Sequence, residues 1–439
     1  MPAMPDTLSS SFDAIVAGSG PGGAMVAREL ARAGARVLLL ERGGDAPLRG
    51  TLGQMAQVAA MPGRGAFLHR DASLLVRALT VGGTSTLNFA TAAPPPAALF
   101  AAHGIDLAPF LAALRAELPI APLPDDLVGP LARRIALGAE AAGLPWRKLD
   151  KMIRPQTCRA GCWRCVYGCP FGAKWSARDL VDDAVRHGAT LLARAQVTRV
   201  RVEAGRAAGV EALVDGRMRV FTAPQVVLAA GGIGTPRILR ASNLLESDPP
   251  FFSDPVVAVM GSVDDLALRD GEAGGAEVPM AAGASFDDEG IALADLTLPK
   301  PMYQAFAAQV GRLDRLGAHG RTLAIMVKIR DEVGGRVGAR WVDKTLTRQD
   351  RARFAHGSKM ARTILREAGA RRVFQSWHFA AHPGGGVPIG AALDADLGTA
   401  TPGLSVCDAS AIPGPWGLPP TLTLLCLGMR LGARLAVRG

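Results

Sequence analysis

Several residue types and patterns are scarce in this chain of 439 residues. No stretch approaches the run of about eighteen apolar residues that a membrane-spanning helix needs, so a transmembrane protein is not indicated. Residues 1–20 show no basic segment followed by a cleavable apolar stretch, and we therefore expect a cytoplasmic protein without its own secretion signal. Six cysteines in the whole chain are too few for the disulfide framework of a small secreted domain.

Lysine is also scarce, although the chain is basic. Lys and Arg together number 49 against 39 Asp and Glu, which gives a formal net charge of +10, yet only seven of the 49 are Lys. The basic residues are scattered, with no group longer than short pairs such as Arg133-Arg134. This distribution predicts a solvated surface and no nucleic-acid partner, and the alternative is a peripheral contact with an anionic membrane at its inner face or with an acidic redox partner.

The length predicts two closely joined domains, and the first of them begins with a recognisable unit. Residues 14–17 are an apolar strand, Gly18-Ser19-Gly20-Pro21-Gly22-Gly23 forms a turn, and residues 24–33 favour a helix. A second buried strand covers residues 36–40 and ends at Glu41. Glycines let a pyrophosphate approach the helix N-terminus, and the acid can bind ribose hydroxyls, so this order indicates dinucleotide binding.

Two later segments return the chain to the same domain. Residues 226–230 form an apolar strand that runs into Gly231-Gly232-Ile233-Gly234-Thr235-Pro236, and residues 404–406 lead into Asp408-Ala409-Ser410. Both have the strand-then-turn pattern of a doubly wound sheet. The nucleotide domain is therefore expected to be discontinuous in sequence.

Four separated blocks resemble the glucose-methanol-choline (GMC) family of FAD-dependent oxidoreductases. They are residues 81–88 and 230–239, which resemble flavin-binding segments, 382–390, which resembles the catalytic-histidine motif, and 408–423, which resembles the closing flavin-site segment. The resemblance implies an α/β fold with a doubly wound, Rossmann-type FAD domain and a smaller α+β substrate domain. We expect the FAD domain over residues 1–95, 185–248 and 385–439, a connecting region over 96–184, and the substrate domain over 249–384.

The connecting region contains four closely spaced cysteines, Cys158, Cys162, Cys165 and Cys169, followed by Pro170. The spacing differs by one residue from the ferredoxin run whose thiolates hold an iron-sulfur cluster, and it indicates a 4Fe-4S or 3Fe-4S cluster. Tetrahedral zinc, disulfides or free thiols are the alternatives. The two other cysteines lie in apolar stretches that are typical of a buried core.

Residues 165–174 are similar to two branches of the family that carry such cysteines. One branch comprises bacterial sugar dehydrogenases whose flavin subunit holds an iron-sulfur cluster, and the other comprises long-chain fatty-alcohol oxidases. The stretches 329–350 and 368–370 are also similar to the fatty-alcohol oxidases. The resemblance does not choose between the branches.

Alcohol oxidation needs a base beside the flavin, within hydrogen-bond reach of the substrate hydroxyl. His382 matches the family's first catalytic position, and imidazole titrates in a useful range. His378 would face the same pocket if its segment were helical, with packing as the alternative. At the second catalytic position the family usually has His or Asn, but here Pro419 offers neither a side-chain donor nor a backbone N–H.

The resemblance also implies a set of residues that bind the flavin nucleotide. These are Gly18, Ser19, Gly20, Pro21, Gly22, Gly23, Glu41, Arg42, Gly82, Gly83, Thr84, Asn88, Val197, Gly231, Asp408, Ala409 and Thr421.

The predicted function is dehydrogenation of a small hydrophobic alcohol, with electrons leaving through the cysteine-bound cluster to a quinone or carrier protein. A hydrophobic substrate is favoured over a sugar because residues 249–381 are rich in Met, Ala and Leu and poor in aromatics. A flavin-dependent reductase or desaturase is the alternative favoured by Pro419, and a non-catalytic electron-transfer subunit is the other. The sequence leaves the oligomeric state open.

Overall fold

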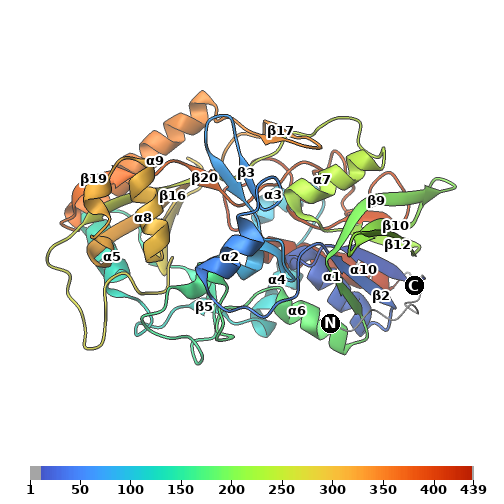
Figure 1. The fold of residues 1–439 in the computed structure, drawn as a ribbon, viewed down its shortest axis with the longest axis horizontal. Helices are drawn as coiled ribbons and strands as arrows, with labels where there is room; N and C mark the ends of the chain where they lie inside the picture. Colours follow the sequence, from blue (N-terminus) through green and yellow to red (C-terminus); the bar gives the residue numbers. More distant parts are fainter. Residues whose placement is uncertain (1–10, 438–439) are drawn as a thin grey trace.

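The computed structural model describes residues 11–437, and it has two parts joined side by side (Figure 1). Residues 1–10, part of the segment in which we found no secretion signal, lie outside the described residues. One part is built on a parallel sheet with helices, and the other on a larger, mainly antiparallel sheet. Every helix within residues 11–437 is too short or too polar to cross a membrane.

The parallel sheet has the strand order β21-β12-β1-β2-β8. Its strands come from widely separated segments: β1 (Ala14–Ala17), β2 (Val37–Glu41), β8 (Thr190–Ala193), β12 (Gln225–Leu228) and β21 (Leu404–Val406). All four pairings are parallel. The predicted α/β class with a doubly wound, discontinuous nucleotide domain is therefore confirmed.

Helix α1 (Pro21–Arg32) begins directly after β1 and packs against α10 (Thr421–Ala436) and α6 (Arg178–Arg186). The close packing of α1 against the sheet depends on two of its glycines. A Cβ atom at Gly22 would lie 2.1 Å from the carbonyl oxygen of Cys407, and one at Gly23 would lie 2.1 Å from that of Gly18. Any larger residue at these two positions would push α1 away from the sheet.

Further elements complete the nucleotide part. Helix α7 (Gly231–Ala241) follows β12, and a three-stranded antiparallel sheet is formed by β9 (Ala195–Glu203), β10 (Arg206–Val214) and β11 (Arg217–Thr222). The short helix η1 (Gly83–Thr86) contacts η2 (Arg164–Tyr167), and η5 (Ala409–Ala411) packs against α7.

The second part is a nine-stranded sheet in which β13 (Val256–Ser262) and β16 (Thr322–Ile329) are central and fully buried. Alternate residues of a strand point to opposite faces of the sheet, and here each face packs against a helix. Val257 and Val259 of β13 pack in one core cluster with α9 (Arg348–Glu367), while Ala258 and Met260 pack in another with α8 (Lys300–Gln309). The capping box between Thr347 and Asp350 fixes the start of α9.

The remaining strands of this sheet come partly from outside the range 249–384 that we predicted for the substrate domain. Within that range are β14 (Ala282–Phe286), β15 (Ile291–Asp295), β19 (Arg371–Gln375) and β20 (Phe379–Ala380). Outside it are β3 (Ala66–Leu68), β4 (Leu74–Val76) and β6 (Arg147–Lys148). Strand β4 joins by pairing in parallel with β20, so the sheet edge is completed by a hairpin from early in the chain.

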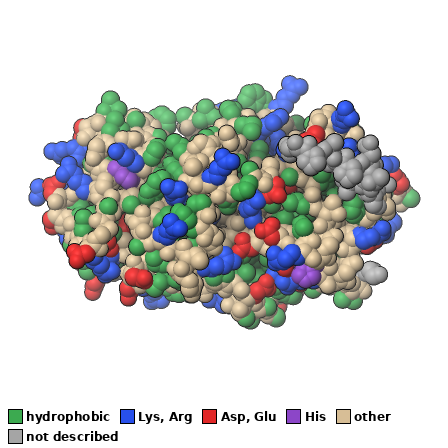
Figure 2. Space-filling view, turned by 60° about the horizontal axis from the view of Figure 1, so that its bottom comes forward, with side chains coloured by type: hydrophobic (Ala, Val, Ile, Leu, Met, Phe, Trp, Pro, Cys, Tyr) green, Lys and Arg blue, Asp and Glu red, His purple; other side chains and the backbone are tan. Residues whose placement is uncertain are grey.

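The other elements complete the two parts. They are α2 (Leu52–Ala59), α3 (Ala97–Ala101), α4 (Ala108–Glu117), β5 (Ile120–Pro122), α5 (Pro130–Ala141), β7 (Asp150–Met152), η3 (Leu313–Arg315), η4 (His319–Arg321), β17 (Arg336–Val337) and β18 (Val342–Asp343). On the molecular face in Figure 2, Lys and Arg side chains are interspersed with acidic and apolar ones, and they form no continuous basic patch there.

Candidate functional site

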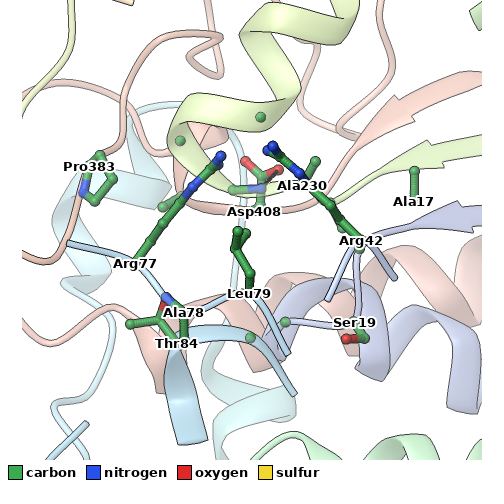
Figure 3. A pocket seen from close by; sticks show the side chains of 18 of the residues that line it. Ala17, Ser19, Arg42, Arg77, Ala78, Leu79, Thr84, Ala230, Pro383 and Asp408 are labelled. Carbon is green, nitrogen blue, oxygen red and sulfur yellow. Dashed lines mark hydrogen bonds between the residues drawn. The ribbon is translucent and has the colours of Figure 1, made fainter. Parts of the chain in front are cut away.

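A cavity of about 670 Å³ is lined by residues from the parallel sheet, α1, α7 and the β3–β4 hairpin (Figure 3). Sixteen of the residues that we predicted for cofactor binding or catalysis line it: Gly18, Ser19, Gly20, Pro21, Gly22, Glu41, Arg42, Gly83, Thr84, Asn88, Val197, Gly231, His382, Asp408, Ala409 and Thr421. Two predicted binding residues, Gly23 and Gly82, do not line the cavity. They act through backbone packing instead, since Gly23 contacts Gly18 and the Gly82 N–H donates to Ser19 Oγ at 3.0 Å.

Space for a ligand is left open at the start of α1. Gly20 precedes the helix and Pro21 occupies its first turn, where a missing N–H costs nothing. A Cβ atom built on Gly20 would have no protein atom within 4 Å, although the residue lines the cavity. The helix N-terminus favours negative charge, so this open space suits a phosphate group.

Glu41 is fixed at the end of β2. Its carboxylate accepts hydrogen bonds from the Ser19 N–H at 3.1 Å, from Ser19 Oγ at 2.6 Å and from the Gly43 N–H at 2.6 Å. The side chain is buried and lines the cavity. A carboxylate held this firmly can accept hydrogen bonds from ribose hydroxyls without losing its position.

Asp408 has a structural role at the opposite side of the cavity. One carboxylate oxygen accepts hydrogen bonds from the Gly231 N–H at 2.8 Å and from Thr235 Oγ1 at 2.5 Å, and the other accepts from Ser410. Burial raises the pKa of this carboxyl group. Asp408 thus joins the end of β21 to the first turn of α7 and shapes the cavity between them.

The cavity also has five arginines, of which the sequence had indicated only Arg42. The others are Arg64, Arg77, Arg237 and Arg340. Among the described residues, none of the five is within salt-bridge distance of an Asp or Glu carboxylate, in contrast to most other arginines of the chain. In an arginine-rich sequence nothing marked these positions individually, because they come from five different segments.

Arg77 and Arg42 extend from opposite sides of the cavity toward α7 (Figure 3). Arg77 is buried, and its Nε donates to the carbonyl of Arg64 at 2.8 Å. Burial, together with the charges of Arg42 and Arg237, lowers the pKa of Arg77 to about 9. Unpaired guanidinium groups that face one another are stabilised by an anion between them. The cavity therefore fits a dinucleotide with its diphosphate among these arginines.

His382 lies at one end of the cavity with Ala381 and Pro383. Its ring nitrogen Nδ1 is 3.1 Å from the Lys328 ammonium group and 3.5 Å from the Asp254 carboxylate. Burial lowers the pKa of His382, Lys328 lowers it further, and Asp254 acts in the opposite direction. With Nδ1 facing these two groups, Nε2 is the nitrogen left for a ligand.

His378 does not join this site, contrary to our expectation of a shared pocket. That expectation required a helix, but β19 ends at Gln375 and His378 lies between it and β20. The His378 ring lies 3.3 Å from the Asp71 carboxylate and is not among the residues that line the cavity. The segment is extended because it pairs with β13, which a local helical pattern could not reveal.

Pro419 lies in the loop before α10, at the predicted second catalytic position. The neighbouring Pro420 lines the cavity, whereas Pro419 does not. In the same loop, the Gly417 N–H donates to Asp254 Oδ1 at 2.7 Å. The loop is therefore tied to the acid that faces His382, although Pro419 itself brings no polar group.

The four cysteines of the connecting region are free thiols. Cys165 is buried and the other three are half-buried. Burial raises the pKa of Cys158 to about 12, and the neighbouring thiols add to this effect. The donor chemistry fits a soft metal or an iron-sulfur cluster, but among residues 11–437 no three His, Cys, Asp or Glu side chains are close enough together to hold a metal ion.

Two buried lysines lie beside the cysteines. Lys151 and Lys174 both face Cys165, and burial lowers the pKa of each to about 8. Lys174 also donates to the Asn88 carbonyl at 3.1 Å, and the Asn88 side chain lines the cavity. Lys174 thus lies between Cys165 and the η1 segment, where it donates to the carbonyls of Ser85 and Thr86 at 2.8 Å.

Comparison with known proteins gives a consistent result. The family model described as GMC oxidoreductase matches residues 12–253. An uncharacterized GMC-type oxidoreductase of Mycobacterium tuberculosis is 36% identical over 249 residues, which cover 53% of this chain and 39% of the relative. Long-chain-alcohol oxidase FAO1 of Arabidopsis thaliana is 27% identical over 416 residues, 84% of this chain and 53% of that protein. The chain therefore spans about half or less of the length of these two relatives.

Solved structures agree in fold. Pyridoxine 4-oxidase from Mesorbium loti superposes with a TM-score of 0.75 at 18% identity, covering 96% of this chain and 98% of that one. A variant formate oxidase from Aspergillus oryzae, used to study FAD modification, gives a TM-score of 0.71 at 16% identity and covers 98% of this chain and 99% of its own. At these identities the likeness establishes the fold alone.

Proposed function

The chain belongs to the GMC oxidoreductase family, and from this premise we propose that it dehydrogenates a hydrophobic alcohol with FAD as its cofactor. FAD dependence and oxidoreductase activity follow from the family. The observation that carries the proposed reaction is the position of His382, which lines the nucleotide cavity with Nδ1 engaged by Lys328 and Asp254. A base in this place meets the need of alcohol oxidation for a proton acceptor beside the flavin.

Different residues of the chain bind the cofactor and accept the proton. Glu41 holds the ribose, the open space at Gly20 admits the diphosphate, and Arg42 and Arg77 neutralise it. FAD, when bound, supplies the acceptor for the hydride that leaves the alcohol carbon. His382 takes the hydroxyl proton at Nε2, which prepares the carbon–hydrogen bond to break.

The hydrophobic nature of the substrate is proposed from two observations. Residues 249–381 are rich in Ala and Met, and they contain only two Trp and one Tyr that could stack on a sugar. The similarity to a long-chain-alcohol oxidase extends over 84% of the chain. The composition favours an apolar substrate in general, and the relative's name favours a long-chain alcohol.

A panel of alcohols tests this proposal. The purified protein is mixed anaerobically with short-chain, long-chain and aromatic alcohols and with sugars, and flavin bleaching is followed by absorption. We expect long-chain primary alcohols to bleach the flavin and sugars to leave it oxidised. Bleaching by sugars alone would contradict a hydrophobic substrate, and failure of every alcohol would contradict dehydrogenation.

A second function is favoured by Pro419. A reductase or desaturase on an apolar substrate needs no second group to hold a hydroxyl, and proline supplies none. In a reductase the flavin would be reduced by a carrier and reoxidised by the apolar substrate, whereas in a desaturase the apolar substrate would reduce the flavin and a carrier would reoxidise it. In neither case would an alcohol bleach the flavin. A non-catalytic flavin subunit would exchange electrons with a carrier only.

For the electrons leaving the flavin, we propose an iron-sulfur cluster held by the four cysteines, with a quinone or carrier protein as acceptor. Lys151 and Lys174 support this proposal, because buried positive charge compensates the negative charge of thiolates and sulfide. Holding a cluster requires the loop to draw its sulfurs closer together than it does here. Zinc remains the alternative. A cytoplasmic protein with peripheral contact at the inner face of the membrane suits a quinone acceptor.

Replacing Cys165 by serine tests the cluster. We expect the anaerobically purified protein to contain iron and acid-labile sulfide, and Cys165→Ser to lose or degrade the cluster because the most buried thiolate is removed. Reoxidation of the flavin by an external acceptor should slow more than its reduction by substrate. Cys426→Ala, which removes a buried thiol outside the loop, is the matched control and should keep its iron.

Metal analysis gives the contrary outcomes directly. Stoichiometric zinc without iron, or four intact thiols without metal, would contradict the cluster proposal. Neither result would affect the assignment of FAD or of His382.

A further inference from the structure

A buried ion pair lies directly behind His382. Lys328 and Asp254 are 3.1 Å apart, with side chains 3% and 0% exposed. Pairing of β13 with β16 sets Lys328 opposite Val256, which brings the ammonium group to the segment that contains Asp254. Both charges face the same imidazole nitrogen, Nδ1, at 3.1 and 3.5 Å.

The position of Asp254 is secured from two directions. Its backbone is in the left-handed region, with a φ of 50°, and its N–H donates to Asp331 Oδ1 at 2.9 Å. Asp331 is itself paired with Lys344 at 2.7 Å. The Gly417 N–H binds the other carboxylate oxygen of Asp254. Strained, over-determined backbone of this kind is typical of functional sites.

An ammonium group and a carboxylate favour opposite protonation states of Nδ1. Lysine only donates, so it pairs with an unprotonated Nδ1 and leaves the proton on Nε2. The carboxylate only accepts, so it pairs with a protonated Nδ1 and leaves Nε2 free to act as a base. Each charge also shifts the cost of forming an imidazolium ion, the lysine raising it and the aspartate lowering it.

We propose that Lys328 and Asp254 are paired positioning residues for His382, which act on the ring through Nδ1. Lys328 is the nearer group at Nδ1, and Asp254 becomes the hydrogen-bond acceptor when Nδ1 carries the proton. In that state Asp254 stabilises the imidazolium ion formed when the substrate hydroxyl gives its proton to Nε2. Lys328 neutralises Asp254 and keeps His382 uncharged before that transfer. This inference rests on the proposed alcohol dehydrogenation.

No other charged group reaches the ring in the described part of the chain. Asp331 and Lys344 are the next nearest pair along the network, and they are bound to each other and to the backbone of residues 251–254. Besides burial, the charges of Lys328 and Asp254 therefore account for the shift in the pKa of His382.

Two single variants have opposite signatures in the pH dependence of flavin reduction. In Lys328→Met an unneutralised carboxylate faces the ring, so His382 becomes protonated more readily. We expect the rate at pH 7 to fall about tenfold and to recover as pH rises, because the basic form returns. In Asp254→Asn the lysine alone faces Nδ1 and holds the proton on Nε2. We expect a loss of about 10²- to 10⁴-fold that raising the pH does not recover.

Controls separate this effect from damage to the fold. Removing one partner of a buried ion pair destabilises a protein, so FAD content and unfolding temperature are measured for every variant. Arg28→Met removes a similarly buried cation, which is paired with Glu29 and does not line the cavity, and should leave the pH profile unmoved. The double variant Asp254→Asn/Lys328→Met leaves neither charge on Nδ1 and should show no recovery at high pH of the kind seen in Lys328→Met.

Nitrogen NMR of the holoenzyme tests the inference without any substrate. The chain has seven histidines, and the signals that disappear in His382→Ala identify the ring. We expect the midpoint of its titration to move to higher pH in Lys328→Met and the proton to move from Nδ1 to Nε2 in Asp254→Asn. Unchanged midpoint and tautomer in both variants would overturn the proposal. Failure of all alcohols to bleach the flavin, with these NMR changes present, would instead overturn the proposed function alone.

Discussion

Replacing His382 by alanine is expected to slow reduction of the flavin by substrate roughly 10²- to 10⁴-fold, which is the usual contribution of a positioned base. The loss follows from removing Nε2, the ring nitrogen that faces away from Lys328 and Asp254. FAD should stay bound, because the ring lies at one end of a cavity whose other contacts are intact. Anaerobic stopped-flow absorption at saturating alcohol measures the rate.

His378→Ala is the matched control for this experiment. It removes the same side chain four residues away, where the ring pairs with Asp71 outside the cavity lining. We expect a change in stability but little change in the rate of flavin reduction. An equal loss in both variants would mean that the effect of His382→Ala is structural, and an unchanged rate in His382→Ala would remove this residue from the mechanism.

The second large effect concerns FAD binding. Gly20→Val would place a branched side chain in the open space at the start of α1, where no protein atom lies within 4 Å and where the diphosphate is expected. Overpacking typically costs about 1–3 kcal/mol, which corresponds to a dissociation constant about 5- to 150-fold higher. Equilibrium dialysis and the flavin-to-protein absorbance ratio measure the change.

Gly53→Val provides the comparison. Gly53 also has no atom within 4 Å of a built Cβ, but it is exposed on α2 and does not line the cavity. This variant should bind FAD as the unmodified protein does. Full FAD occupancy in a folded Gly20→Val protein would show that the diphosphate does not pass the start of α1.

The sequence allowed the nucleotide part of the fold to be predicted well, because its signals are local. The strand at Leu404–Val406 has the residues that we expected, and α1 ends at Arg32, one residue before the end of the range 24–33 that we expected for this helix. Buried parallel strands are short apolar runs followed by glycine, and such runs are visible without knowledge of their partners. His382 was predicted in a different way, from the resemblance of residues 382–390 to the family's catalytic-histidine motif.

The groups behind His382 could not be predicted in this way. Lys328 and Asp254 meet the histidine only because β13 pairs with β16 in a particular register, and register is set by long-range packing. One signal was present but unused. Lysine is rare in this arginine-rich chain, and four of the seven lysines, Lys151, Lys174, Lys328 and Lys344, are buried. A compact ammonium group suits a buried site that the larger guanidinium group does not fit.

The cavity arginines show a second reason for incomplete prediction. Arg64, Arg77, Arg237 and Arg340 come from separate segments of a chain in which Arg is common, so no local pattern distinguished them from surface residues. Their shared property is the missing carboxylate partner, which only the folded chain reveals. His378 was expected near His382 because a helix would bring residues four apart to the same face. The segment is extended instead, because its neighbour Phe379 pairs with β13.

The most direct test of the account is anaerobic flavin reduction by a long-chain primary alcohol that carries deuterium on its hydroxyl-bearing carbon. Our account predicts that the alcohol bleaches the flavin and that deuteration slows the bleaching, because that carbon–hydrogen bond breaks in the step for which His382 removes the hydroxyl proton. Flavin that stays oxidised with every alcohol tested, while a redox carrier still reduces it, would contradict alcohol dehydrogenation as the function of this protein.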